Sequence, residues 1–406
     1  MSSRFVRWLT GADMQRAVFG FLRRHHPNLV LGKRVLVTRA EDVNEVLKTD
    51  AVFGVTEIYA EKMERTTGPF FLGMENTPQY QRESSLSRRA VRPEDLERLR
   101  TMVREHAEQL IAQARPTGRL DVVNGLARPV AVGMVDRFFG VPGPDPDPET
   151  MKRWMRLIFW DIFLNQGNDA DVIARARAAS AELKTYMEGL IAQRKAGLAT
   201  EGRNDFLTRL LRMQEDEATR LDDDAVRRNV GGIIVGAVDT SSKALAQVVN
   251  ELLERPEALG EAQSAARAED TARVAAHAVE ALRFDPHNPL LLRTCHEDYV
   301  LARGTDREVR IPKGTLVIAS TIAAMFDPEV MQHPDEFRVD RPPQGYMHVG
   351  RGLHTCYGEH INHIVLPEVL GCLLRLRNLR RAPGGEGRMR FEGPFPDRLV
   401  VEFDAG

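Results

Sequence analysis

The chain has 406 residues and a formal net charge of −2, with 43% hydrophobic and 28% charged residues. This composition is sufficient for a large buried core, and the balanced charge excludes a global field that would recruit nucleic acid or an anionic membrane. Three cysteines are too few for a disulfide framework in a chain of this length, which indicates a reducing compartment and predicts a cytoplasmic protein.

The N-terminal segment, residues 4–24, is amphipathic, but charged residues interrupt it every few positions. It lacks the apolar run of roughly 18 residues that a spanning helix needs. It also lacks the apolar core of a signal peptide. We therefore expect no membrane anchor.

Short β patterns alternate with long helical ones along the chain. Residues 28–38 read as two strands joined by a turn at Gly32, and similar patterns recur near 298–320 and 388–404. Helical periods fill about 93–285 and 358–380, with breakers such as residues 141–148. No repeat or linker separates these parts. The sequence predicts a single domain over residues 1–406, mainly α with a small β portion.

One predicted helix, residues 223–254, is about 48 Å long at 1.5 Å per residue. Its middle is apolar on all sides and must be buried. That middle contains Gly231, Gly232, Gly236, Asp239 and Thr240. Glycine weakens a helix and a buried carboxylate is costly. One interpretation is that the glycines make room for a ligand and the acid supplies a proton. The other is that the glycines admit a neighbouring helix and the threonine bonds to its own helix.

Cys356 lies in the segment HVGRGLHTCYGEH, between two glycines and a helix predicted to begin near Gly358. The positive end of a helix favours a thiolate. Four interpretations remain open from these residues: a buried structural thiol, a zinc ligand, a nucleophile, or a heme thiolate with glycines that let the backbone lie flat against the macrocycle. The zinc interpretation uses the side chains of His348, His354, Cys356, His360 and His363, but no CxxC pair accompanies them.

Four motifs, taken together, resemble the cytochrome P450 family. VGRGLHTCYG resembles the family's heme-binding loop, and GAVDT, residues 236–240, resembles its oxygen-activating helix. EALR, residues 280–283, resembles the ExxR motif, and FRVDR, residues 337–341, the segment that supplies a second arginine. The strand LLLRTCHEDYVL resembles the one that carries an arginine to a heme propionate. The motifs occur in the family's order.

The resemblance implies a role for each matched residue. Cys356 would bind the heme iron, His354 and Arg293 would neutralise the propionates, and Asp239 and Thr240 would relay protons and hydrogen-bond the bound oxygen. The resemblance also implies loop positions at Gly350, Gly352 and Gly358 and a glycine, Gly236, that leaves room for dioxygen. Tyr80 would donate a hydrogen bond to a propionate. Glu280, Arg283 and Arg341 would form a structural triad. The implied substrate pocket includes Ile233, Ala237, Leu290, Leu291 and Trp160, although an ordinary core role is an equal alternative for the aromatic residue.

The resemblance also implies a fold and an activity. The fold would be of the cytochrome P450 type, with heme b (iron protoporphyrin IX) between the long central helix and the Cys-bearing loop. The chain would insert one oxygen atom from O2 into a lipophilic small molecule, using electrons from a ferredoxin- or flavodoxin-type donor and its reductase. Three alternatives remain: a peroxide-driven or oxidative-coupling heme-thiolate enzyme, a non-catalytic heme sensor or carrier, and a zinc protein.

Five positions depart from the family pattern. Val349 stands where the family has an aromatic residue, and Tyr357 where it usually has an aliphatic one. Tyr80 and Ser84 replace a His-x-x-x-Arg pair for a propionate, although Tyr80 could still donate one hydrogen bond. Pro367 falls inside the helix after the cysteine, which predicts a kink or an early end.

Overall fold

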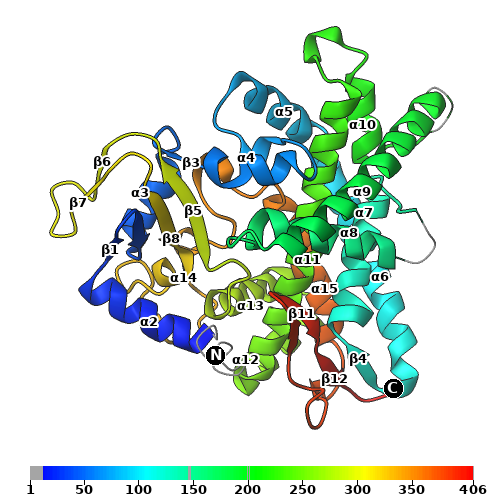
Figure 1. Cartoon of the computed structure of the whole chain (residues 1–406). Helices are drawn as coiled ribbons and strands as arrows, with labels where there is room; N and C mark the ends of the chain where they lie inside the picture. Colours follow the sequence, from blue (N-terminus) through cyan, green and yellow to red (C-terminus); the bar gives the residue numbers. More distant parts are fainter. Residues whose placement is uncertain (1–11, 145–147, 199, 201, 406) are drawn as a thin grey trace. The chain divides into compact units, whose positions relative to one another are not determined.

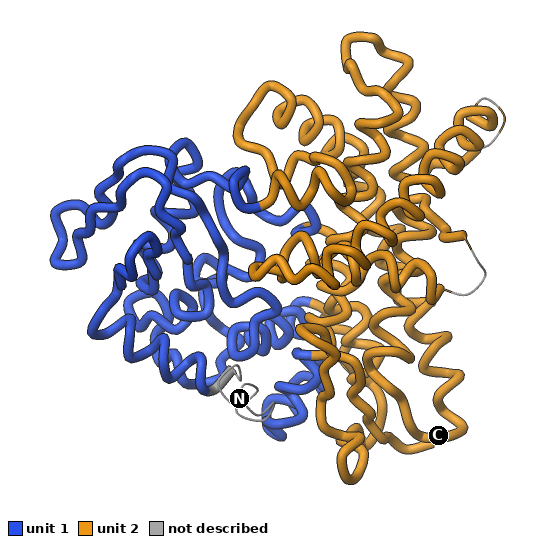
Figure 2. Tube along the Cα trace, viewed as in Figure 1, with its two compact units in different colours: residues 1–58, 247–265, 272–359 blue, residues 59–246, 266–271, 360–406 orange. Residues whose placement is uncertain are grey.

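The computed structural model describes residues 12–144, 148–198, 200 and 202–405. Parts of the N-terminal segment and of the breaker at 141–148 lie outside the described residues. The chain divides into two compact units, each built from three segments (Figure 2). Unit 1 comprises residues 1–58, 247–265 and 272–359, and unit 2 comprises residues 59–246, 266–271 and 360–406. The single-domain organisation stays a prediction.

Unit 1 contains a five-stranded sheet in the order β1-β2-β8-β5-β3. β1 (Asn28–Leu31) and β2 (Arg34–Val37) form the predicted antiparallel hairpin, with Gly32 at φ +61° in its turn. β8 (Leu316–Ser320) runs parallel to β2 and antiparallel to β5 (Leu290–Cys295), and β3 (Phe53–Gly54) closes the edge. β6 (Tyr299–Leu301) and β7 (Val309–Ile311) form a separate ladder.

The helices of unit 1 pack against this sheet or near it. They are α2 (Ala12–His25), α3 (Ala40–Lys48) and α14 (Thr321–Ala324), together with most of α12 (Pro256–Arg267) and all of α13 (Thr271–Phe284) except Thr271. The apolar face of α3, with Val43, Val46 and Leu47, meets the inward side chains Val35 and Val37 of β2 in one buried cluster. The alternation of β2 and the helical period of α3 are therefore satisfied by the same core.

Unit 2 is predominantly helical (Figure 1). It contains most of α4 (Thr56–Glu64), α5 (Pro78–Arg89), α6 (Pro93–Ala114), α7 (Arg128–Arg137), α8 (Glu149–Phe159), α9 (Ala170–Gly197) and α10 (Phe206–Met213). A π-helical turn, η4 (Trp160–Leu164), follows α8. β12 (Val400–Glu402) pairs with β4 (Arg119–Asp121) and β9 (Arg380–Arg381), and β10 (Arg390–Glu392) forms a hairpin with β11 (Phe395–Arg398).

Two helices carry residues of the candidate site. α11 (Asp223–Leu253) ends one residue before its predicted C-terminus. α15 (Glu359–Leu374) continues through Pro367, so the predicted early end is wrong. The proline removes one backbone donor, but the buried Val365, Leu370 and Leu373 around it keep the second half of the helix packed.

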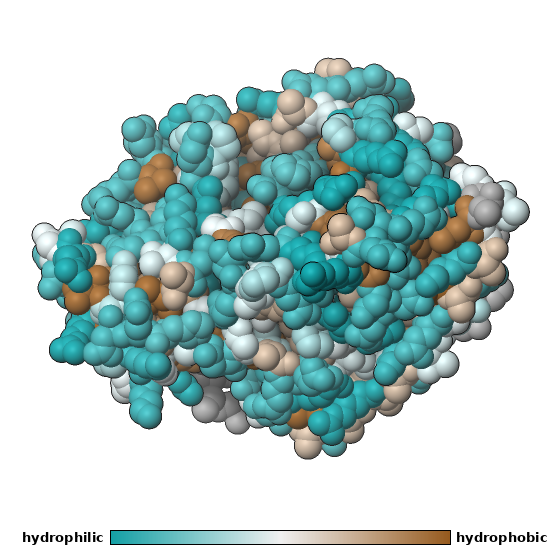
Figure 3. Space-filling model, turned by 90° about the horizontal axis from the view of Figure 1, so that it is seen from above, coloured by the Kyte–Doolittle hydropathy of each residue, from teal (hydrophilic) through white to brown (hydrophobic). Residues whose placement is uncertain are grey.

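The surface is largely hydrophilic where it is seen from above (Figure 3), with apolar side chains scattered singly or in small groups. None of the helices in the described part of the chain has an apolar stretch long enough to cross a bilayer.

Candidate active site

The middle of α11 presents a half-buried stripe that follows the buried residues 229–235. Gly236, Ala237, Thr240, Ser241 and Ala244 are only half-buried, while their neighbours on the other faces are buried. Their spacing places them on one face of the helix. A Cβ added at Gly236 would meet no atom within 4 Å. The helix therefore leaves space beside Gly236.

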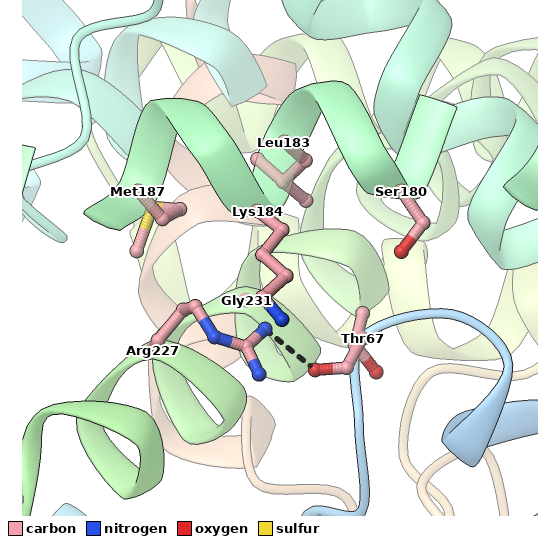
Figure 4. A pocket seen from close by; sticks show the side chains of 7 residues that line it. All are labelled: Thr67, Ser180, Leu183, Lys184, Met187, Arg227 and Gly231. Atoms are coloured by element: carbon pink, nitrogen blue, oxygen red, sulfur yellow. Dashed lines mark hydrogen bonds between the residues drawn. The ribbon is translucent and has the colours of Figure 1, made fainter. Parts of the chain in front are cut away.

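The other two glycines of α11 serve different purposes. A Cβ at Gly232 would lie 2.5 Å from the ring of Phe70, so this glycine admits a neighbouring side chain. Gly231 borders a small cavity of about 10 Å³, into which Lys184 points and where Arg227 donates to the Thr67 carbonyl at 3.0 Å (Figure 4). The cavity is lined by Thr67, Ser180, Leu183, Lys184, Met187, Arg227 and Gly231. At Gly232 the structure matches the packing interpretation, whereas an added Cβ at Gly231 or Gly236 would meet no atom within 4 Å. A ligand beside these two glycines stays a prediction.

Thr240 is bonded to its own helix. Its hydroxyl donates to the carbonyl of Gly236, one turn earlier, and lies 3.5 Å from the carbonyl of Ala237. This bond from the threonine side chain to the backbone of its own helix is the one that the second interpretation of α11 predicts. It also places the hydroxyl beside the open position at Gly236, so the two interpretations of this helix apply together.

Asp239 is buried, with 4% of its surface exposed. Its Oδ1 lies 3.7 Å from Nε of Arg156 on α8 and 3.9 Å from Nε of Arg128 on α7. Its Oδ2 has no hydrogen-bond partner among the described residues. Burial raises the pKa of Asp239 to about 6, and the charge of Arg156 limits the rise. A carboxyl with this pKa can hold or release a proton near neutral pH.

Arg156 connects Asp239 to the protein surface. The same guanidinium pairs with Glu392 on β10, whose side chain is 60% exposed. Arg128 is held on its other side by Asn124 at 2.6 Å and by the Pro396 carbonyl at 2.5 Å. Sequence reasoning missed these three charged residues. A buried acid requires cations nearby, but nothing in the spacing along the chain identifies which of many arginines supplies them.

The loop around Cys356 is shaped by backbone bonds and by two glycines. The Cys356 N–H donates to the Val349 carbonyl at 2.9 Å, and its carbonyl accepts from Glu359 N, the first residue of α15, at 3.2 Å. Gly350 and Gly352 both have φ +73°. A Cβ at Gly352 would also lie 2.2 Å from the Leu47 carbonyl, so only glycine fits there.

The rest of the predicted loop residues surround Cys356. The cysteine is half-buried, follows η7 (Gly352–His354) and precedes the turn that contains Gly358. His354, the last residue of η7, is also half-buried. Asp50 fixes the same turn, because its Oδ2 accepts from Leu353 N at 3.0 Å. On β5, Arg293 is 4% exposed and donates to the Leu292 carbonyl at 2.9 Å.

Glu280, Arg283 and Arg341 meet in unit 1. Glu280 and Arg283 are fully buried, and Arg283 donates to the Glu280 carboxylate from Nε at 2.9 Å and from Nη2 at 2.8 Å. Arg341 Nε adds a bond of 3.2 Å. Two further partners were not foreseen: Tyr346 donates to Glu280 at 2.9 Å and the Arg338 N–H at 2.8 Å. The carboxylate is therefore paired and fully hydrogen-bonded.

The remaining predicted residues have more ordinary surroundings. Tyr80 on α5 is 6% exposed, with its ring edge-on to Phe71 at 6.3 Å. Trp160 packs on Phe395 of the β10–β11 hairpin at 5.9 Å, which is a core contact. Leu290 and Leu291 on β5 are half-buried, and a Cβ added at Gly350 would lie 3.4 Å from the Leu291 side chain. On α11, Ile233 is buried and Ala237 is half-buried.

The histidines near Cys356 do not form a metal site in unit 1. His348 Nε2 is bonded to the Val279 carbonyl at 2.9 Å. The side chains of His348, His354 and Cys356 do not converge as three metal ligands. The donors of unit 1 instead fit heme: a cysteine in a glycine-shaped loop, with cationic side chains in the same unit for propionates.

Comparisons with known proteins agree with this donor set. The cytochrome P450 family profile matches residues 26–401. The chain is 24% identical to pulcherriminic acid synthase of Bacillus subtilis over 91% of this chain and 89% of that protein, and 27% identical to cytochrome P450 107B1 of Saccharopolyspora erythraea over 88% and 85%. The crystal structure of CalO2 superposes with a TM-score of 0.83 at 25% identity, covering 98% of this chain and 99% of the other.

Proposed function

The chain belongs to the cytochrome P450 family, and from this premise we propose that it inserts one oxygen atom from O2 into a lipophilic small molecule. The family makes it a heme-iron monooxygenase, an oxidoreductase that uses O2 and a redox partner. The observation that carries the finer proposal is the buried Asp239 beside Thr240 and the open position at Gly236. A sensor or carrier has no need of a titratable acid buried at that place.

We assign the cofactor as heme b, held by the Cys356 sulfur, with His354 and Arg293 neutralising the propionates. When bound, heme supplies the iron chemistry that activates dioxygen for transfer of one oxygen atom. The N-terminus of α15 begins three residues after Cys356, and its dipole stabilises the thiolate form. Glu280, Arg283 and Arg341 fix the segment before this loop and take no part in the chemistry.

Asp239 and Thr240 handle the proton. Asp239 holds it at the carboxyl group, where a pKa of about 6 allows both protonation states near neutral pH. The Thr240 hydroxyl, which donates to the Gly236 carbonyl, lies beside the open position at Gly236. Arginine does not lose its proton, so Arg156 holds the carboxylates of Asp239 and Glu392 close to each other instead of carrying the proton itself.

We propose the electron donor, the location and the substrate class from the sequence motifs and the composition of this chain. Its sequence contains no flavin or nicotinamide fingerprint, so we propose a separate ferredoxin- or flavodoxin-type donor with its reductase. The low cysteine content supports a cytoplasmic location and the apolar residues of α11 support a lipophilic substrate. We further propose that the two units act as one domain.

The test is to purify the protein with ample heme and compare it with Cys356→Ser. We expect one heme per chain, a carbon-monoxide spectrum of thiolate ligation, and turnover of a lipophilic compound that requires O2 and a reductase system. Cys356→Ser should lose the thiolate spectrum and activity, whereas the control Cys372→Ser, a buried cysteine on α15, should keep both. Turnover with peroxide alone, or heme without any turnover, would refute the O2-dependent proposal.

A further inference from the structure

Val349 lacks the aromatic ring that the family places seven residues before the cysteine. The backbone of Val349 is nonetheless important. Its carbonyl accepts the Cys356 N–H at 2.9 Å, which couples the residue that carries the sulfur to residue 349. The side chains that fix residues 346–349 therefore set the position of the Cys356 sulfur.

Two stacked rings lie in this segment. The rings of Tyr346 and His348 have centroids 5.5 Å apart and planes inclined by 27°. Tyr346 donates to the Glu280 carboxylate at 2.9 Å, and His348 Nε2 is bonded to the Val279 carbonyl at 2.9 Å. Consecutive residues of α13 thus each hold one ring of the stacked pair.

The bond at Val279 defines the state of His348. A carbonyl only accepts hydrogen bonds, so His348 Nε2 carries the hydrogen whether the ring is neutral or charged. The Val279 carbonyl has two lone pairs and can accept this bond in addition to one from its own helix. His348 is therefore anchored to α13 with its ring orientation fixed by the stack on Tyr346.

We propose that His348 is a positioning residue for the thiolate. Its bond to α13 and its stack on Tyr346 hold Val349 in place, and the backbone bond from Cys356 to Val349 then holds the Cys356 sulfur. His348 would thus take over the role of the family's aromatic ring. This inference rests on the proposed function, because it assumes that Cys356 binds the iron. His348 acts through the backbone of Val349 and does not itself touch the reacting atoms. The family pattern does not include this residue.

The experiment separates the two contacts of His348 in the heme-loaded protein. His348→Phe keeps a ring to stack but loses the donor, and His348→Gln keeps a donor but loses the ring. His348→Phe, which loses one hydrogen bond, should release heme to a heme-free myoglobin acceptor about fivefold faster, which corresponds to about 1 kcal/mol. His348→Gln, which loses the stacked ring, should also release heme faster than the wild type. Both should also lower the thiolate-ligated fraction in the carbon-monoxide spectrum. The control His25→Phe, on the exposed last turn of α2, should change neither.

A rescue experiment distinguishes positioning from general packing. Val349→Phe, which restores the family's ring, should recover the thiolate fraction when combined with His348→Gln. If the His348 variants do not fold by circular dichroism, Tyr346 gives a second test. Tyr346→Phe keeps the stack but loses the bond to Glu280, so it should lower the thiolate fraction less than Tyr346→Leu, which loses both.

The results against this proposal differ from those against the proposed function. If wild-type protein shows thiolate ligation and both His348 variants match it in heme release and thiolate fraction, the positioning role is wrong and the proposed function stands. Failure of Val349→Phe to restore any thiolate fraction also contradicts positioning. Wild-type protein without thiolate ligation overturns both proposals.

Discussion

Asp239 shows at the scale of one residue how burial creates reactivity. A carboxyl in water has a pKa near 3.9, but at this position burial raises the pKa to about 6 despite two arginines within 4 Å of Oδ1. The arginines lie too far away for short hydrogen bonds, so they compensate only part of the desolvation. The result is an acid that can exchange protons under physiological conditions.

Replacement of Asp239 by asparagine should lower turnover about 100-fold, the order of effect expected for loss of a general acid. Heme content and the carbon-monoxide spectrum should stay unchanged, because the side chain does not hold the cofactor. The wild-type rate should also show a pH dependence centred near 6 that the variant lacks. Steady-state kinetics with saturating reductase measure both effects, and an unchanged rate would exclude Asp239 from proton transfer.

The same residue should influence stability with pH. Because the folded pKa of about 6 exceeds the unfolded value, the folded state binds a proton that the unfolded state does not between pH 6 and 4. The stability of the wild type relative to Asp239→Asn should therefore increase as pH falls from 7 to 5, by about 1.3 kcal/mol. Urea unfolding of the two proteins at each pH gives this difference. A difference independent of pH would contradict the raised pKa.

Glu280→Gln should destabilise the protein by about 3–5 kcal/mol, because it leaves the buried Arg283 and Arg341 without their counter-charge. Heme should be lost more readily as a consequence. Urea unfolding and heme content after gel filtration measure the two effects. The control is Glu336→Gln, which changes an exposed residue of the same unit. If Glu280→Gln equals the wild type in stability and heme retention, the structural role of the triad is refuted.

At the scale of elements, α11 combines a packing function with an open face. Its glycines look alike in the sequence, but Gly232 faces the ring of Phe70 while Gly236 faces space. Its C-terminal part behaves as an ordinary buried helix, in which Glu251 pairs with Arg255 at 2.6 Å and burial raises the pKa of Glu251 to about 7. The half-buried residues to which we assign the function lie in the turns between Gly236 and Ala244.

Alanine substitutions of these glycines should have opposite effects on stability. Gly232→Ala should cost about 1–3 kcal/mol through its clash with Phe70. Gly231→Ala and Gly236→Ala should each stabilise the heme-free protein by about 0.5–1 kcal/mol, because alanine favours the helix and meets no atom. Of these two, only Gly236→Ala should reduce turnover. Urea unfolding and kinetics of the three variants test this order, and equal effects at Gly231 and Gly232 would contradict it.

At the scale of the whole molecule, cofactor binding should add to stability by mass action. A ligand that binds only the folded state at 100 times its dissociation constant stabilises it by about 2.7 kcal/mol. The urea midpoint should therefore rise with free heme concentration, and Cys356→Ser should weaken this dependence while Cys372→Ser should not. A midpoint independent of heme would mean that the folded chain does not bind it selectively.

Much of the fold was predictable because its signals are local. The hairpin at residues 28–38 and the extent of α11 follow from short-range periodicity and turn chemistry, and the structure confirms both. The β8 segment was recognisable as a strand, but its parallel pairing with β2, 282 residues earlier in the chain, was not. The early end at Pro367 was predicted wrongly, because local proline chemistry was outweighed by burial of the residues around it.

The sequence alone determined the family and indicated the candidate residues: a cysteine in a glycine loop, an acid and an alcohol in a long helix, and the structural side chains of Glu280, Arg283 and Arg341. Only the tertiary structure decided which arginines approach Asp239, that Tyr346 completes the Glu280 network, and that His348 binds to α13. The physical reason is that residue type and spacing encode local backbone conformation, whereas desolvation and ion pairing depend on atoms that folding brings together from distant parts of the chain.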